Sequence, residues 1–180
     1  MLTFLVGGAR SGKSTLAVQM GEHHGGAVTF VATAEGFDDD LRERITRHRD
    51  ERPEHWLTVE APLDLGAAIA AVPFDHLLIV DCLTLWLANL LVHEPEDALR
   101  SVRVEQFVSA LRARAGHTEV PTVIVSNEVG LGIHPDTSLG RSYRDELGRL
   151  NQTVAGIADR TLLMVAGRAL RLENPWDLLR

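Results

Sequence analysis

The feature that most constrains this 180-residue chain is a glycine-rich segment near its amino terminus. The segment follows the pattern Gly-x-x-x-x-Gly-Lys-Ser and consists of Gly7, Gly8, Ala9, Arg10, Ser11, Gly12, Lys13 and Ser14. An apolar run, Leu2–Val6, precedes it, and a helical pattern, Lys13–His23, follows it. In that context the glycines let backbone N–H groups curl around phosphate oxygens, whereas a chance glycine turn would lack the flanking strand and helix. The sequence therefore predicts a phosphate-binding loop.

Short apolar runs alternate with helical patterns along the rest of the chain. Strands are expected at Leu2–Val6, Ala27–Ala32, Trp56–Val59, His76–Asp81, Thr122–Ser126 and Thr161–Val165. Helices are expected at Lys13–His23, Asp39–Glu51, Leu63–Ala71, Leu83–Val92, Glu96–Ala115 and Gly140–Ala158. This alternation indicates an α/β fold of the P-loop NTPase type, with three α/β/α layers and a mainly parallel sheet. Arg168–Leu172 is expected to add a carboxyl-terminal antiparallel strand or hairpin, and residues 1–180 to form a single nucleotide-binding catalytic domain.

Composition narrows the classes of function. The chain has 18 Lys and Arg against 25 Asp and Glu, a formal net charge of −7, which argues against nucleic-acid binding because that needs a basic face. Its single cysteine, Cys82, excludes an intramolecular disulfide and fits a cytoplasmic location. The most apolar stretch, Leu77–Val92, carries Asp81 and is shorter than the ~20 apolar residues of a spanning helix, so no membrane span is expected.

The glycine-rich segment and one later carboxylate suggest how a nucleotide is held. Lys13 is expected to reach the β- and γ-phosphates, and Ser14 to bind Mg²⁺, with Thr15 beside them in the nucleotide site. Asp81 ends a buried apolar run, and the carboxyl ends of parallel strands share one edge of the sheet. We therefore expect Asp81 to be the second Mg²⁺ ligand, the alternative being that it caps the next helix.

Two absences weigh against other nucleotide-binding classes. No glutamate follows Asp81, so the hydrolytic base of a motor ATPase is missing at that position. No Asn-Lys-x-Asp sequence occurs, so the guanine signature of a switch GTPase is missing too. These absences favour a transferase over a nucleotide-binding regulatory protein.

Three further groups of residues are candidates on their chemistry alone. Leu41, Ile45 and His48 share one face of the expected helix Asp39–Glu51, and an imidazole can act as acid, base or nucleophile, although a lone histidine there is more often structural. Residues 126–132 follow a buried strand and offer Asn127 and Glu128 at the same sheet edge, or form a solvated loop. Arg141 and Arg144 are spaced to meet a phosphate or carboxylate, or to remain surface charges.

Several further motifs stand in a fixed order along nearly the whole chain. They are Val31-Ala32-Thr33-Ala34, Arg44-Ile45 with His48-Arg49, Arg52-Pro53-x-x-Trp56-x-Thr58-x-Glu60, Asp81-Cys82-Leu83-Thr84-Leu85-Trp86 with Asn89-Leu90-Leu91, Ser126-Asn127-Glu128-Val129-Gly130, and Arg144-Asp145 with Gly148-Arg149-x-Asn151-Gln152. The glycine-rich segment alone is generic, but this ordered set is specific. With it, the chain resembles the bifunctional adenosylcobinamide kinase/adenosylcobinamide-phosphate guanylyltransferases of cobalamin biosynthesis.

The resemblance implies two reactions on one corrinoid substrate. Members phosphorylate the aminopropanol hydroxyl of adenosylcobinamide with ATP or GTP, and then transfer GMP from GTP to adenosylcobinamide phosphate, releasing pyrophosphate. The GMP passes through a guanylylated histidine, and the matching position here is His48; this chain has Arg47 where relatives can carry a second histidine. Thr33 and Glu60 are the expected guanosine contacts. The alternative is a small-molecule P-loop kinase without nucleotidyl transfer.

The resemblance also implies an assembly. Relatives form homotrimers, so a homotrimer is expected here. Trp86 and the apolar helix around it are candidates for the subunit interface, and a corrinoid is large enough to bind between subunits.

Overall fold

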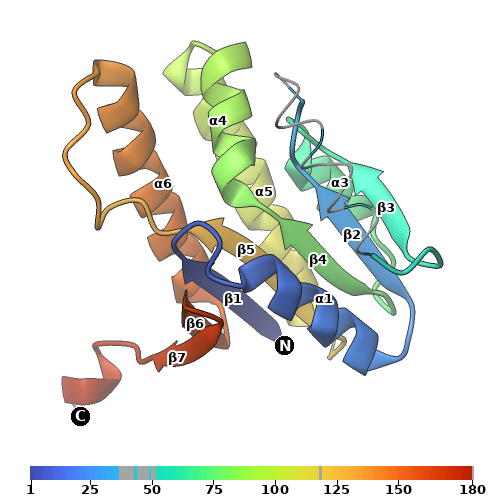
Figure 1. Cartoon of the computed structure of the whole chain (residues 1–180). Helices are drawn as coiled ribbons and strands as arrows, with labels where there is room; N and C mark the ends of the chain where they lie inside the picture. Colours follow the sequence, from blue (N-terminus) through green and yellow to red (C-terminus); the bar gives the residue numbers. More distant parts are fainter. Residues whose placement is uncertain (37–42, 44–48, 50–51, 118, 180) are drawn as a thin grey trace.

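The computed structural model describes residues 1–36, 43, 49, 52–117 and 119–179 (Figure 1). Its strands are β1 (Leu2–Gly7), β2 (Val28–Ala32), β3 (Leu57–Glu60), β4 (Leu77–Asp81), β5 (Thr122–Asn127), β6 (Arg160–Val165) and β7 (Arg168–Leu172). Its helices are α1 (Lys13–His24), α3 (Leu65–Ala71), α4 (Leu83–His93), α5 (Asp97–His117), α6 (Ser138–Ile157) and the 3₁₀ helix η1 (Asp177–Leu179). The helix expected over Asp39–Glu51 lies outside the described residues, apart from Glu43 and Arg49.

The described strands form one seven-stranded sheet in the order β3-β2-β4-β5-β1-β6-β7. The pairs from β3 to β6 are parallel, and only β7 runs antiparallel, against β6. This confirms the predicted α/β fold, its mainly parallel sheet and its carboxyl-terminal hairpin. β1 lies between β5 and β6, so the glycine-rich segment that follows it leaves from the interior of the sheet.

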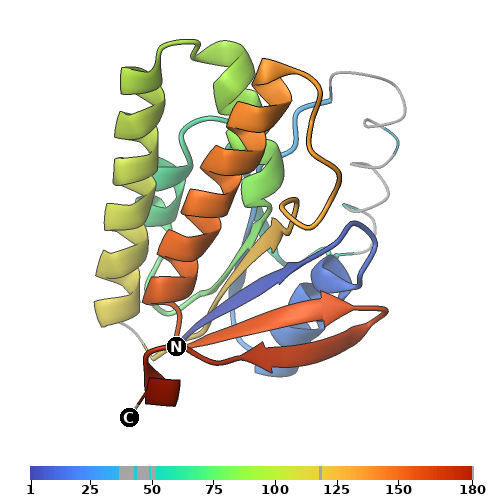
Figure 2. The ribbon, with the colours of Figure 1, turned by 90° about the vertical axis from the view of Figure 1, so that its left-hand side faces the viewer.

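Alternating side chains of the strands fill two hydrophobic cores, one on each face of the sheet. In β4, Leu78 and Val80 join the core beneath α3, α4, α5 and α6, whereas Leu77 and Ile79 join the core beneath α1. Figure 2 shows the same division, with α1 on one side of the strands and α4, α5 and α6 on the other. The sheet is therefore covered on both faces, as a near-continuous apolar strand such as β4 requires.

Two glycines let helices approach their neighbours closely. A Cβ at Gly21 in α1 would lie 2.4 Å from the ring of Trp56, and a Cβ at Gly66 in α3 would lie 2.8 Å from the backbone of Gln106 in α5. Gly21 therefore makes room for a buried tryptophan beside α1, and Gly66 brings α3 against the backbone of α5.

Trp86 lies in the interior of the chain and not at its surface. It is fully buried, its ring centroid is 5.2 Å from that of Phe107, and its Nε1 donates a 2.9 Å hydrogen bond to the Leu63 carbonyl. The prediction that Trp86 contributes to a subunit interface is therefore wrong, because packing within the chain already covers the indole.

The Leu63 carbonyl also accepts from the Leu65 N–H, so the backbone turns there and α3 begins at Leu65, two residues later than expected.

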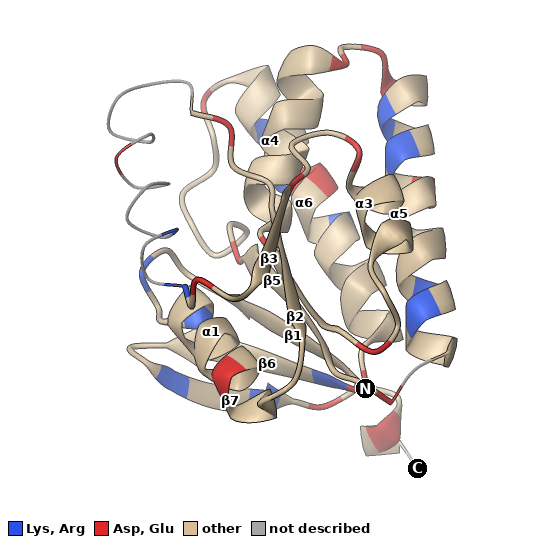
Figure 3. Cartoon of the chain, turned by 90° about the vertical axis from the view of Figure 1, so that its right-hand side faces the viewer, with Lys and Arg blue, Asp and Glu red and all other residues tan. Residues whose placement is uncertain are grey.

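Charged residues of both signs are interspersed over the helices and loops (Figure 3). Within the described ranges, no helix is both long enough and apolar enough to cross a bilayer.

The contact between α3 and α5 gives the first prediction. Gly66→Ala should lower the free energy of unfolding by about 1–3 kcal/mol, because the added methyl group meets backbone atoms that cannot rotate away. Gly148→Ala in α6 is the matched control: nothing lies within 4 Å of its Cβ, so the gain in helix propensity should raise stability by up to about 1 kcal/mol. Urea unfolding measures both; equal midpoints for the two variants would contradict the packing described for α3.

Candidate active site at the carboxyl edge of the sheet

The carboxyl ends of the central strands bring the predicted site residues to one edge. Gly7, at the end of β1, pairs with Asn127 of β5 and with Met164 of β6. Asp81, at the end of β4, pairs with Ala32 of β2. The glycine-rich loop, the Asp81 carboxylate and the segment after β5 therefore lie along the same edge, where ligands bind in open α/β sheets.

The backbone of the loop needs glycine at two positions. Gly7 has φ +151°, and a Cβ there would lie 2.3 Å from the Met164 carbonyl oxygen. Gly12 has φ +96°, and a Cβ there would lie 3.3 Å from the Cα of Gly167 in the β6–β7 turn. The Gly167 N–H also donates a 3.0 Å hydrogen bond to the Ser11 carbonyl. The loop is thus fitted against the β6–β7 hairpin, with no space for side chains between them.

Lys13 points its ammonium group into the loop. Its Nζ donates to the carbonyls of Gly7 (3.0 Å) and Gly8 (2.7 Å) and to Ser11 Oγ (3.3 Å), and the residue is buried. The loop itself thus fixes a positive charge at its centre. That is the position from which an ammonium group reaches terminal phosphates in P-loop proteins.

The start of α1 completes an environment suited to anions. Its N-cap is Gly12, so no side chain caps the free N–H groups of the first turn. Free N–H groups and the helix dipole together favour phosphate at such a terminus. Gly7, Ser11 and Lys13 are buried, whereas the rest of the loop is open to solvent at least in part: Gly8, Ala9, Arg10 and Thr15 are exposed, and Gly12 and Ser14 are half-buried.

The Asp81 carboxylate is half-buried at the end of β4, and within the described part of the chain no hydrogen bond or ion pair engages it. It is therefore available to a cation. Among the described residues, no group of three or more His, Cys, Asp or Glu side chains could hold a metal ion by itself. Mg²⁺ is usually bound by one or two protein ligands together with phosphates and water, so the Ser14 hydroxyl and the Asp81 carboxylate fit this ion.

Thr33 holds the segment after Asp81. Its hydroxyl donates to the Cys82 carbonyl (2.7 Å) and accepts from the Cys82 N–H (2.8 Å), and its own carbonyl accepts from Asn89 Nδ2 (2.8 Å). Thr33 is completely buried, so in this structure its hydroxyl positions the backbone next to Asp81. Burial, reinforced by the charge of Asp81, raises the pKa of the Cys82 thiol to about 11 and keeps it protonated at neutral pH.

A hydrogen-bonded network joins α4 and α6 to the end of β5. Thr84 Oγ1 accepts from the Asn127 N–H (2.7 Å), and the Thr84 carbonyl accepts from the Tyr143 hydroxyl (3.2 Å). Asn151 Nδ2 donates to the Asn127 carbonyl (3.0 Å). Burial raises the pKa of Tyr143 to about 12, so its hydroxyl remains a donor. The sequence had indicated Asn127 as a polar residue at this edge but gave Thr84, Tyr143 and Asn151 no role, although Thr84 and Asn151 lie inside motifs that mark the family resemblance.

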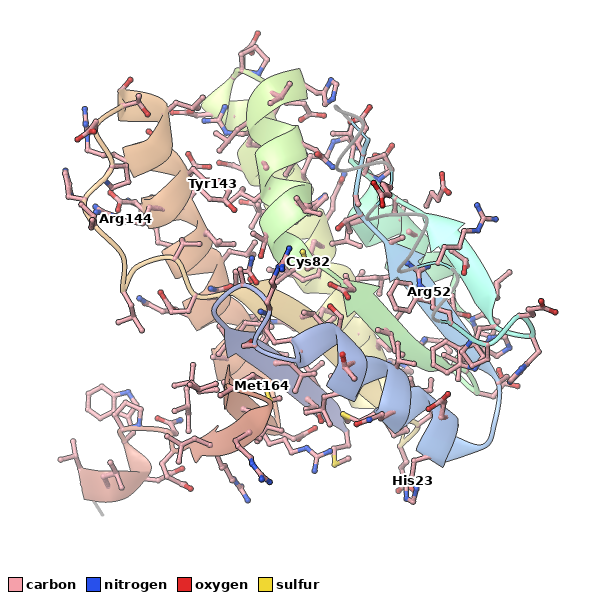
Figure 4. All side chains as sticks on the ribbon, in the orientation of Figure 1. His23, Arg52, Cys82, Tyr143, Arg144 and Met164 are labelled. Atoms are coloured by element: carbon pink, nitrogen blue, oxygen red, sulfur yellow. The ribbon has the colours of Figure 1, made fainter. Side chains whose placement is uncertain are left out.

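Within its described part, the structure does not bring the remaining predicted residues together beside the phosphate-binding loop. Glu60 is exposed at the end of β3, an outer strand of the sheet. His48 lies outside the described residues, so its relation to the loop stays a prediction. Arg52, which is labelled in Figure 4, places its guanidinium 3.7 Å from the centre of the Phe30 ring. Because Trp56 is buried as well, the motif that runs from Arg52 to Glu60 has a packing role.

The fit of the loop against β6 gives the second prediction. Gly7→Ala should destabilise the fold by about 1–3 kcal/mol and abolish nucleotide binding, because its methyl group collides with the Met164 carbonyl. Gly8→Ala is the control from the same loop: nothing lies within 4 Å of its Cβ, and stability should change by less than about 0.5 kcal/mol. Thermal unfolding with and without nucleotide separates them, and a stable, nucleotide-binding Gly7→Ala protein would refute the geometry.

Comparisons with known proteins identify the family. The family profile described as cobinamide kinase/cobinamide phosphate guanyltransferase matches residues 3–172. The chain is 41% identical over 175 residues to the bifunctional adenosylcobalamin biosynthesis protein CobP of Pseudomonas aeruginosa, covering 97% of this chain and 98% of that protein. It is 35% identical over 184 residues to the corresponding protein CobU of Salmonella typhimurium, covering 96% of this chain and all (100%) of that protein.

Among solved structures, the crystal structure of the RadB recombinase is similar, with a TM-score of 0.54 and 20% identity, covering 90% of this chain and 73% of that one. At that identity the likeness shows the fold alone. The full-length family match and the curated relatives go further: the chain belongs to the family of bifunctional cobinamide kinases and cobinamide-phosphate guanylyltransferases, transferases that act in assembling the nucleotide loop of cobalamin.

Proposed function

We propose that this chain phosphorylates the aminopropanol hydroxyl of adenosylcobinamide with ATP or GTP, and then transfers GMP from GTP to the resulting phosphate through a guanylylated His48. The observation that carries the proposal is the convergence of three features at one sheet edge: the Lys13 ammonium, the uncapped start of α1, and the Asp81 carboxylate, which no described residue engages. The chain is proposed to act as a single catalytic domain over residues 1–180.

In the kinase reaction, the loop positions the triphosphate and the substrate hydroxyl attacks the γ-phosphorus. Lys13 and the N–H groups of the loop and of the first turn of α1 bind the phosphate oxygens, with Gly7, Gly8, Ala9, Arg10, Ser11, Gly12, Ser14 and Thr15 forming the walls. Phosphoryl transfer needs little covalent chemistry from the protein. Positioning and electrostatic stabilisation therefore account for most of this half of the reaction.

Ser14 and Asp81 are the residues that would hold Mg²⁺. When bound, the ion supplies positive charge that neutralises the phosphate oxygens. Asp81 is suited to this because its carboxylate is half-buried and has no partner among the described residues. Thr33 keeps the backbone next to Asp81 in place through its two hydrogen bonds to Cys82.

In the guanylyl transfer, a ring nitrogen of neutral His48 attacks the α-phosphorus of GTP, and the bond from that phosphorus to the pyrophosphate oxygen breaks. A phosphate oxygen of adenosylcobinamide phosphate then attacks the same phosphorus and releases the imidazole. Splitting one transfer into two substitutions is the advantage of a covalent intermediate. Glu60, exposed at the end of β3, is the proposed guanosine contact, and the buried Thr33 supports the site through its hydrogen bonds to Cys82. We also propose a cytoplasmic homotrimer.

Labelling with GTP carrying a radioactive α-phosphate tests this function. The intact protein should take up acid-labile label in the presence of Mg²⁺, and His48→Ala should take up none, because the variant lacks the imidazole proposed to form the P–N bond. His23→Ala is the matched control, since His23 is exposed near the end of α1, away from the phosphate-binding loop (Figure 4). It should be labelled like the intact protein.

Two outcomes would decide against parts of the proposal. An intact protein that binds GTP and phosphorylates cobinamide but stays unlabelled would be a kinase without nucleotidyl transfer. Full labelling of His48→Ala would place the covalent intermediate on another residue.

A further inference from the structure

Two aliphatic side chains project from the loop between β5 and α6. Leu131 is 86% exposed and Ile133 is 96% exposed, and Leu139, in the first turn of α6, is 59% exposed. Single exposed aliphatic residues are ordinary on protein surfaces. Two almost completely exposed aliphatic side chains only two positions apart are less ordinary, and apolar surface exposed beside a functional site is a feature of binding surfaces.

Hydrogen bonds hold this loop in shape. The Glu128 carboxylate accepts from the Gly130 N–H (2.6 Å), and Thr137 Oγ1 accepts from the Gly140 N–H (3.1 Å). Arg141 Nη1 donates to the carbonyls of Pro135 (3.0 Å) and Asp136 (2.8 Å). Both ends of the loop are therefore fixed to their neighbours, and its middle, with Leu131 and Ile133, is directed into solvent.

The segment between β5 and α6 starts beside the phosphate-binding loop. The Glu128 N–H donates a 3.1 Å hydrogen bond to the Gly7 carbonyl, and the preceding residue, Asn127, pairs with Gly7 in the sheet. Figures 1 and 2 both show the segment after β5 passing beside the loop between β1 and α1. A molecule lying on Leu131 and Ile133 would thus adjoin the place where the transferred phosphate is held.

The chemistry of the substrate matches this position. Cobinamide is a broad corrin ring whose faces and edges carry methyl groups, and its aminopropanol arm ends in the hydroxyl that receives the phosphate. The arm must reach the phosphate-binding loop while the ring stays outside it, because the ring is far larger than a nucleotide phosphate. A fixed aliphatic surface next to the loop suits the methyl-rich ring, since burying both removes apolar surface from water.

We propose that Leu131 and Ile133 form the platform on which the corrin ring of cobinamide rests during both reactions, an inference that rests on the proposed function. The carboxamide groups at the ring's edge would meet the polar rim of the same loop. His134 and Arg144 lie on this rim, joined by a 2.8 Å hydrogen bond between His134 Nδ1 and Arg144 Nη1.

The test is a double variant, Leu131→Ser with Ile133→Ser. Removing both aliphatic side chains should raise the KM for adenosylcobinamide about tenfold, because the apolar surface that they bury with the ring is lost. The KM for the nucleotide should not change. Equilibrium dialysis with adenosylcobinamide alone should show the same loss of affinity, and both substituted residues are exposed, so the variant should fold as the intact protein does.

A control variant removes two exposed leucines elsewhere. Leu178→Ser with Leu179→Ser changes residues of η1 that are 73% and 75% exposed, and it should leave the KM for adenosylcobinamide unchanged. If both double variants raise that KM equally, or if neither does, the platform is not at Leu131 and Ile133. If the loop variant alters the sedimentation coefficient but not the KM, these residues cover a protein surface and the proposal is overturned.

Labelling from α-labelled GTP separates this proposal from the function on which it rests, because that half-reaction needs no corrinoid. A loop variant that is labelled normally but binds adenosylcobinamide as tightly as the intact protein overturns the platform and leaves the function standing. If the intact protein takes up no label, the proposed guanylyl transfer is wrong, whatever the result for the loop variant.

Discussion

The close approach of the phosphate-binding loop to the strand beside it is the constraint on which the rest of this structure depends. Gly7 ends β1 between β5 and β6, and the Met164 carbonyl occupies the space that any side chain at Gly7 would need. The β6–β7 turn then meets the loop again at Gly12 and Ser11. The loop is thus held on its outer side by the hairpin, and its carbonyls are placed where the Lys13 ammonium contacts them.

The other residues of the candidate active site lie beside this loop, along one edge of the sheet. Because β4 and β5 run parallel to β1, Asp81 and Asn127 end at the same edge as Gly7, and Thr33 and Thr84 fix the backbone around them through hydrogen bonds. Most of these hydrogen bonds are at least partly buried, where a low local dielectric strengthens them. The proposed nucleotide site is therefore formed directly at the ends of the strands. The proposed corrinoid platform lies farther out, on the loop that follows β5.

The sequence predicted the parts of this arrangement that leave a local signal. Apolar runs such as 77–80 located the strands, and the spacing of Gly7, Gly12 and Lys13 located the loop. Long-range contacts left no such signal, and nothing near Trp86 in the sequence indicates that Phe107 covers it. Likewise, nothing near Arg114 indicates that its guanidinium donates to the distant carbonyls of Val72 and Pro73. The burial of that guanidinium, which lowers its pKa, was therefore not predicted. For the same reason the role of Thr33 beside Cys82 was not foreseen.

We infer that one phosphate-binding loop serves both reactions, and the variant Lys13→Ala can show whether it does. Because the Lys13 ammonium lies at the centre of the loop, phosphorylation of adenosylcobinamide from γ-labelled ATP and protein labelling from α-labelled GTP should fall together, each by at least about a hundredfold. Urea unfolding of the same preparation checks that the variant is folded. A folded variant that loses phosphorylation but is labelled from GTP at the intact protein's rate would require a second nucleotide site and would rule out a shared loop.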